Sequence, residues 1–277
     1  MSAFGDLSRI NTNLQSMEAL RSLQGSNAEL GMRQLRLATG SKINRAEDDS
    51  AGYSIATKLQ AKVRGQAQAL ANVGDAKSLL TISEGSLSSV MEILQTMKEK
   101  TVQAANDTMG STERTAIDNQ LTALSAEVTD ILGDTKFNST SLFTSTSFSF
   151  HVNAEAADSF SVSIGTLSVA AMSIASADIT VSTAALATAL LGSIDAAITT
   201  ISDKMGTIGD SQKRLTFKQD ALGIAMNNNE AARSRIADAD FAKEQMEIVK
   251  LQILQQTGTA AVAQANSAPQ GVLQLLG

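Results

Sequence analysis

The chain has no cysteine and no tryptophan, and only one proline, one histidine and one tyrosine among its 277 residues. A chain without cysteine forms no disulfide and offers no thiolate for catalysis or metal binding. The single histidine, His151, has no carboxylate cluster at ligand spacing beside it, so we expect no metal site there. Aromatic residues make up 3% of the chain, which is poor material for a large compact core, and the composition favours an elongated helical protein.

The net charge and the apolar pattern argue against nucleic acid binding, a cleaved signal peptide and a membrane span. The formal net charge of −6 opposes nonspecific binding to nucleic acid, which needs clustered Lys and Arg. The first ten residues have neither the basic start nor the apolar stretch of a cleaved signal peptide, and no later stretch has 18 uninterrupted apolar residues. We therefore expect no nucleic acid partner and no membrane insertion, and any export would use another route.

Both ends of the chain predict long amphipathic helices. A helix that is apolar on one stripe needs one partner, and a helix that is apolar on most sides needs several. Isolated helices of this kind are marginal in water, so both ends are predicted to be assembly surfaces. Near the start, the stripe contains Leu20, Leu23, Asn27, Leu30 and Leu37; near the end, the apolar residues include Phe241, Ile248, Leu251, Ile253 and Leu254.

Three further apolar ladders occupy the middle of the chain. They run from Leu59 to Leu94, from Ile117 to Ile131 and from Ile194 to Met226, after a turn that we predict near residues 40–49. At ~1.5 Å per residue the first ladder makes a rod roughly 50 Å long. Polar residues interrupt the shared seam, and such residues fix helix register more often than they perform chemistry. They are Lys77, Glu84, Gln212 and Gln219.

The period changes to two between these ladders. Residues 148–152 and 160–164 alternate apolar and polar side chains, which predicts a small β-hairpin with His151 on its polar face. Residues 165–190 show no clear period. We expect the Ser/Thr-rich middle, Ser139–Ser149 and Ser159–Thr183, to lie on the outer surface. The predicted fold is all-α dominated: an elongated antiparallel helical bundle or coiled coil with a small β-hairpin.

No arrangement of residues indicates catalysis. Carboxylates such as Glu47, Asp48 and Asp240 stand where helices start or turn, so capping explains them better than acid–base chemistry does. No glycine pattern forms a phosphate-binding or dinucleotide-binding loop. We therefore predict no catalytic, cofactor-binding or metal residues, no cofactor and no enzyme activity.

Ordered groups of residues at both ends resemble those of bacterial flagellins. In the N-terminal part they are Ile10–Leu14 (INTNL), Leu37–Asn44 (LATGSKIN), Glu47–Gly52 (EDDSAG), Ser83–Leu87 (SEGSL), Val102–Asn106 (VQAAN) and Thr135–Asn138 (TKFN). In the C-terminal part they are Ser234–Ala242 (SRIADADFA), Gln252–Gln256 (QILQQ), Gln264–Asn266 (QAN), Pro269 and Val272–Leu276 (VLQLL). The resemblance covers roughly residues 7–138 and 206–276, and the hairpin segment also looks like the family's ribbon.

The resemblance implies a short flagellin without large outer domains. It implies that residues 1–44 and 239–277 form the N- and C-terminal helices of an inner coiled-coil tube. Residues 45–138 and 191–238 would supply the N-terminal helices and the C-terminal helix of a rod domain, and 139–190 its hairpin and variable Ser/Thr-rich segment. The function implied is self-assembly of many copies into the extracellular helical flagellar filament for swimming motility.

The same resemblance implies partners and interface residues. The partners are an export chaperone on the C-terminal helix, the type III flagellar export apparatus, and hook-associated and cap proteins. In flagellins sensed by the Toll-like receptor, the positions similar to Thr96, Lys100 and Gln120 carry Arg, Leu and Glu, so this chain is expected to be a poor agonist. The expected subunit-interface residues are Ile10, Leu14, Leu20, Leu23, Asn27, Leu30, Leu37, Phe241, Ile248, Leu251, Ile253, Leu254, Val262, Leu273, Leu275 and Leu276.

Two alternatives remain at this point. A hook–filament junction protein of the flagellum shares similar terminal helices, although the SRIADAD stretch and the short middle favour flagellin. A helical-bundle enzyme or sensor would need a cofactor or a ligand pocket, which metal analysis and ligand-shift melts would detect.

Overall fold

The computed structural model describes residues 12–143, 147–155 and 158–276, with side chains up to residue 267. The chain divides into two compact units, Met1–Ala61 with Asn229–Gly277 and Lys62–Asn228. Most described residues are helical, as the sequence predicts. Two long helices, α2 (Ser50–Ala104) and α4 (Ala184–Ala237), contribute residues to both units.

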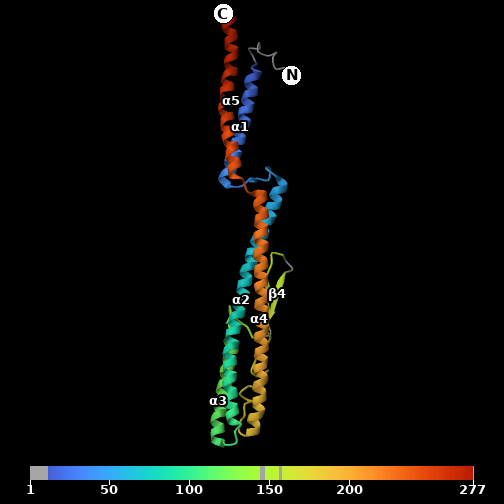
Figure 1. The fold of residues 1–277 in the computed structure, drawn as a ribbon, viewed down its shortest axis with the longest axis vertical. Coiled ribbons are helices and arrows are strands. Elements are labelled where there is room, and N and C mark those ends of the chain that lie inside the picture. Colours follow the sequence, from blue (N-terminus) through green and yellow to red (C-terminus); the bar gives the residue numbers. More distant parts are fainter. Residues whose placement is uncertain (1–11, 144–146, 156–157, 277) are drawn as a thin grey trace. The chain divides into compact units, whose positions relative to one another are not determined.

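The first unit is built on an antiparallel pair of helices, α1 (Leu14–Thr39) and α5 (Phe241–Leu276), which lie side by side (Figure 1). The Asn13 side chain caps α1 by accepting a hydrogen bond from the Ser16 N–H at 3.0 Å. The Asp240 carboxylate caps α5 by accepting hydrogen bonds from the backbone N–H groups of Ala242 and Lys243. The two helices predicted at the chain ends therefore have defined starts.

The turns that follow α1 and precede α5 are joined by backbone hydrogen bonds. The Lys42 N–H donates to the Ala237 carbonyl at 2.6 Å, and the Ala239 N–H donates to the Gly40 carbonyl at 2.9 Å. Gly40 ends α1 with a φ of 67°, a left-handed conformation that glycine adopts without strain. The predicted turn at residues 40–49 is present, and it is bonded to the segment that enters α5.

The second unit is a bundle of α2, α3 (Ser111–Asp134) and α4 around one apolar core (Figure 1). Each of the three predicted ladders contributes buried side chains at steps of three and four, which is the pattern of helices facing one core. The buried set includes Val73, Leu80, Leu87 and Leu94 of α2, Ile117, Leu121 and Val128 of α3, and Ile194, Ile201, Ile208 and Leu215 of α4.

The four polar residues that interrupt the ladders pair across α2 and α4. The Gln212 Nε2 donates to the Glu84 carboxylate at 2.8 Å, and the Lys77 ammonium donates to the Gln219 amide oxygen at 3.2 Å. In each helix the two residues are one heptad apart, so both pairs form only at one register. Residues that fix helix register are expected to pair in this way.

Two small antiparallel sheets lie in the second unit. The predicted hairpin is confirmed: β3 (Ser147–His151) pairs with β4 (Ser159–Ser163), and Phe150 stands opposite Phe160. A second pair, β1 (Lys136–Phe137) with β2 (Thr140–Ser141), was not predicted. Each of these strands has two residues, which is too short for an alternating pattern. The sequence marks this pair only by its turn residues, Asn138 and Ser139, which both have positive φ.

Residues 165–183, which are part of the Ser/Thr-rich middle predicted on the outer surface, differ from that prediction. Its apolar residues enter the core: the segment carries no helix or strand, yet five of its side chains are buried. The Ser125 hydroxyl donates to the Ile174 carbonyl at 2.7 Å, and the Val181 N–H donates to the Asp118 carboxylate at 3.0 Å. The segment is held by irregular contacts that leave no period in the sequence. The five are Leu167, Met172, Ile174, Ile179 and Val181.

By length and composition alone, α4 is apolar enough to cross a membrane, with a mean hydropathy of 1.6 over its most apolar window. The apolar start of α4 supplies Ala187, Leu190, Ile194, Ala197 and Ile201 to the buried core of the second unit. Because 28% of that window is buried, packing in the bundle accounts for part of this apolarity.

Candidate assembly surface

The inner seam of the first unit lies between α1 and α5. Ile248 and Leu251 of α5 are buried, and three leucines of α1 that are one heptad apart are half-buried. A Cβ atom built on Gly258 would lie 3.1 Å from the Leu23 Cδ1, so the helices approach closely there. The six interface candidates that pack within one chain are Leu23, Leu30, Leu37, Ile248, Leu251 and Val262.

A second apolar stripe on α5 faces solvent. Met246, Val249 and Ile253 keep 68%, 46% and 56% of their surface exposed. They are spaced by three and four residues, so they lie on one helix face, and that face is not the seam that contains Ile248 and Leu251. This stripe, called here the outer α5 stripe, is unusual because large apolar side chains rarely gather on the free surface of a soluble monomer.

Helix α1 also carries apolar side chains outside the seam. Leu14, Met17, Leu20 and Leu35 are exposed by 48%, 60%, 45% and 41%. Leu20 belongs to the predicted stripe, but within one chain it is not covered by α5. Both helices therefore present apolar surface to solvent as well as to each other.

The remaining candidates are distributed as follows. Phe241 and Leu254 are exposed by 67% and 44%, and Asn27 is exposed while its side chain accepts a hydrogen bond from Gln255 at 2.9 Å. Ile10 and the side chains of Leu273, Leu275 and Leu276 lie outside the described residues.

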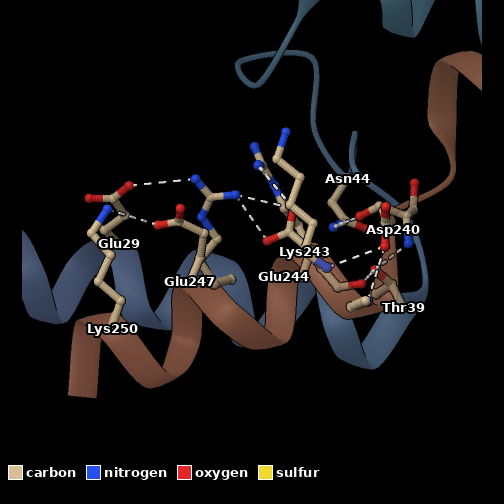
Figure 2. Close-up of polar contacts among 12 residues, drawn as sticks. Glu29, Thr39, Asn44, Asp240, Lys243, Glu244, Glu247 and Lys250 are labelled. Carbon is tan, nitrogen blue, oxygen red and sulfur yellow. Dashed lines mark hydrogen bonds and ion pairs between the residues drawn. The ribbon is translucent and has the colours of Figure 1, made fainter. Parts of the chain in front are cut away.

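An ion network closes the end of the α1–α5 seam that lies next to the turns (Figure 2). The Arg33 guanidinium donates to both carboxylate oxygens of Glu244, at 3.1 and 3.0 Å, and Arg36 lies 3.9 Å from the same carboxylate. Arg33 also lies 3.7 Å from Glu29 on its own helix. The Glu244 side chain is only 7% exposed, and the two arginine side chains are 21% and 19% exposed.

The hydrogen bonds of this network favour the charged form of Arg33. The hydrogen bond from Arg33 to Glu244 raises the pKa of the Arg33 guanidinium above its ordinary value. Glu244 lies in the first turn of α5 and Arg36 in the last turn of α1, where each charge complements the dipole of its own helix.

Sequence reasoning missed this network. The sequence indicates it only by Glu244, an acidic residue in the first turn after the Asp240 cap, and by Arg33 and Arg36 near the end of α1. Such charges are ordinarily solvated, and only the pairing of residues about 210 positions apart in the chain brings them together.

The turn before α2 contains an ordered carboxylate. Asp48 accepts hydrogen bonds from the backbone N–H groups of Asn44 and Arg45 at 2.9 and 3.0 Å. These two bonds, the one from Arg45 foremost, lower the pKa of the Asp48 carboxyl group below its ordinary value. The adjacent Asp49 accepts from the Gly52 N–H at 2.9 Å and caps α2.

The receptor-site equivalents lie in the second unit. Thr96 is exposed on α2, and its hydroxyl donates to the Glu92 carbonyl at 3.1 Å. Lys100 follows one turn later and is half-buried, and Gln120 is exposed on α3. Among the described residues no three His, Cys, Asp or Glu side chains converge as a metal site, and His151 lies exposed on β3.

Comparison with known proteins places both ends of the chain in one family. Residues 10–147 match the model of the bacterial flagellin N-terminal helical region, and residues 191–276 match that of the C-terminal helical region. Flagellin FlaB1 of Treponema pallidum is 33% identical, covering 96% of this chain and 99% of its own length. The flagellin of Halalkalibacterium halodurans is 36% identical, with the same coverage of 96% and 99%.

The fold is also similar to a solved structure described as a flagellar hook-associated protein from Vibrio parahaemolyticus. The TM-score is 0.60 at 15% identity, over 69% of this chain and 100% of that one. At this identity the likeness concerns the fold alone.

Proposed function

This chain belongs to the bacterial flagellins and is a structural subunit of the flagellar filament, not an enzyme, and we propose that its copies assemble through the exposed apolar faces of α1 and α5. The observation that carries the proposal is the outer α5 stripe. It supplies apolar surface that α1 of the same chain does not cover. A second copy of the chain can cover it.

The geometry of the contact decides the kind of polymer. A patch on α5 that meets a different patch on the next copy makes a heterologous contact, and such contacts generate open helical filaments when the rotation does not close. Of the predicted interface residues, those exposed in one chain would make the contacts between copies, whereas those in the α1–α5 seam would hold the pair together. The exposed ones are Leu14, Leu20, Asn27, Phe241, Ile253 and Leu254.

Deletion of either end tests this proposal. Removing residues 1–36 or 242–277 should abolish polymerisation, whereas the second unit should stay folded because its core lies within Lys62–Asn228. Sedimentation measures the polymer and circular dichroism measures the helix content. Long filaments from either truncated protein, at the concentration where the full chain polymerises, would contradict the proposal.

Extracellular assembly requires export of the subunit. We propose that the type III flagellar export apparatus carries it, with a chaperone holding α5 and with hook-associated and cap proteins at the ends of the filament. The support is the same stripe, because exposed apolar surface on α5 needs cover before assembly. A chain with Met246→Gln and Ile253→Gln should lose affinity for such a chaperone in a co-purification experiment. Unchanged co-purification would count against a chaperone at this face.

The receptor-site equivalents support a separate proposal, that this flagellin activates the Toll-like receptor weakly. Lys100 places a charge where a leucine would supply an apolar contact, and Thr96 lacks the anchoring guanidinium of an Arg. The triple variant Thr96→Arg, Lys100→Leu and Gln120→Glu should signal more strongly than the parent monomer in a reporter-cell titration, with filament assembly unchanged. Strong signalling by the parent, or no gain in the variant, would refute it.

A further inference from the structure

Glu244 is a nearly buried carboxylate beside the apolar seam of α1 and α5. We propose that Glu244, held by Arg33 and Arg36, is a positioning residue that sets the register between α1 and α5. The proposal concerns pairing within one chain, so it stands independently of how copies assemble. Its basis is the contact of the Arg33 Nη1 with both carboxylate oxygens, the second arginine at 3.9 Å, and the 7% exposure of the Glu244 side chain.

A charge with so little exposure is tolerated only when it is paired. Removing one partner of a buried pair leaves the other charge without compensation, which destabilises far more than the intact pair stabilises. Any register that separates Glu244 from both arginines therefore carries this penalty. The apolar seam residues carry no such requirement, because leucines one heptad apart fit equally well after a slip of one heptad.

The two neighbouring registers show why the network discriminates. If α5 slipped by one heptad toward the start of α1, Glu244 would take the place opposite Glu29 instead of Arg36, and two carboxylates would be neighbours. If it slipped by one heptad the other way, Glu244 would pass the end of α1 at Thr39 and lose both arginines. The observed register is the one in which the carboxylate meets two guanidinium groups.

Register has a consequence for assembly. The seam fixes which faces of α1 and α5 turn outward along the pair and at what height they lie. A slip of one heptad at ~1.5 Å per residue would move the outer α5 stripe by roughly 10 Å relative to the exposed residues of α1. A neighbouring copy that fits one arrangement would not fit the other.

The absence of native cysteine makes register directly measurable. The Gln255 side chain contacts Asn27 at the observed register, so Asn27→Cys with Gln255→Cys reports that register. Leu20 lies one heptad before Asn27, so Leu20→Cys with Gln255→Cys reports the slipped one. Mild oxidation of the soluble full-length chain, followed by mass analysis, gives the yield of each intrachain disulfide.

We expect the Asn27–Gln255 cysteine pair to dominate in the parent chain. Glu244→Gln should lower the ratio of native to slipped disulfide by roughly tenfold, which corresponds to about 1.4 kcal/mol. Combining Arg33→Glu with Glu244→Arg should recover more of the native disulfide than either reversal alone. Glu247→Gln is the matched control, because Glu247 lies three residues after Glu244 on α5, pairs with Lys250 at 3.5 Å and acts on Arg33 only through a weaker charge interaction. It should change the ratio much less than Glu244→Gln does.

Three results would overturn the inference. They are a ratio that Glu244→Gln changes by less than about twofold, an equal effect of Glu247→Gln, and a parent chain that forms neither disulfide in excess. Failure of the proposed function looks different. A parent chain that never polymerises, but whose native disulfide depends on Glu244, would reject the assembly surface and leave the register assignment intact.

Discussion

Polar replacement of the outer α5 stripe should raise the concentration at which filaments form without unfolding the subunit. The triple change Met246→Gln, Val249→Thr and Ile253→Gln replaces three apolar side chains by polar ones of similar size. Because these side chains are 46–68% exposed in one chain, the substitutions leave the α1–α5 seam untouched. Surface changes of this kind alter subunit stability by less than about 0.5 kcal/mol.

The expected magnitude follows from the area that assembly would bury. Fully burying one large apolar side chain is worth about 1.5–3 kcal/mol, and roughly half of each of the three is still exposed. Each replacement should therefore cost about 1 kcal/mol of subunit addition. Together they cost about 3 kcal/mol, which is a rise of roughly a hundredfold in critical concentration.

Sedimentation at steady state measures the unpolymerised concentration directly, and circular dichroism of the soluble fraction checks the fold. Gln252→Ser, an exposed polar position on the same helix, is the control and should change the critical concentration little. A triple variant that polymerises within about threefold of the parent concentration would refute the assignment of this stripe to the contact between copies.

Three further changes test other parts of the structure. Leu94→Ala should destabilise the second unit by about 2–5 kcal/mol in urea unfolding, because Leu94 is fully buried in its core; a cost below about 1 kcal/mol would contradict that packing. Gly65→Val should weaken the packing of the hairpin on α2, because a Cβ at Gly65 would lie 2.8 Å from the Ala154 Cβ; unchanged hydrogen exchange in β3 and β4 would oppose this. Asp48 has a folded-state pKa below its unfolded value, so its contribution is present above the unfolded value of about 3.9 and is lost as pH falls through the folded pKa. The protection of the backbone amides of residues 40–50, measured against the intrinsic exchange rate at each pH, should therefore fall in acid for the parent, and Asp48→Asn should remove this dependence.

The helices and the hairpin could be predicted from the sequence because each has a period. Apolar residues at steps of three and four give the ladders of α2, α3 and α4, and the alternation around Phe150 and Phe160 gives β3 and β4. Local signals also sufficed for the turns, since Gly40 and Asp49 end and begin helices where the sequence indicates. These features depend on residues near one another in the chain.

The features that were missed depend on contacts between distant residues. The apolar residues of 165–183 enter the core without a regular spacing, and their places are fixed by bonds such as that from Ser125 to Ile174. The Glu244–Arg33 pair joins the two ends of the chain, and nothing in either segment alone distinguishes it from solvated surface charges. For the same reason, the stripe of α1 was predicted as one surface, whereas Leu23 faces α5 and Leu20 does not.

Electron cryomicroscopy of intact filaments, at a resolution that shows side chains, would test the central claim most directly. The account predicts that α1 and α5 of each subunit remain paired and that Met246, Val249 and Ile253 are covered by a neighbouring copy. Filaments in which these three side chains face solvent, with the subunits joined only through residues of Lys62–Asn228, would contradict it.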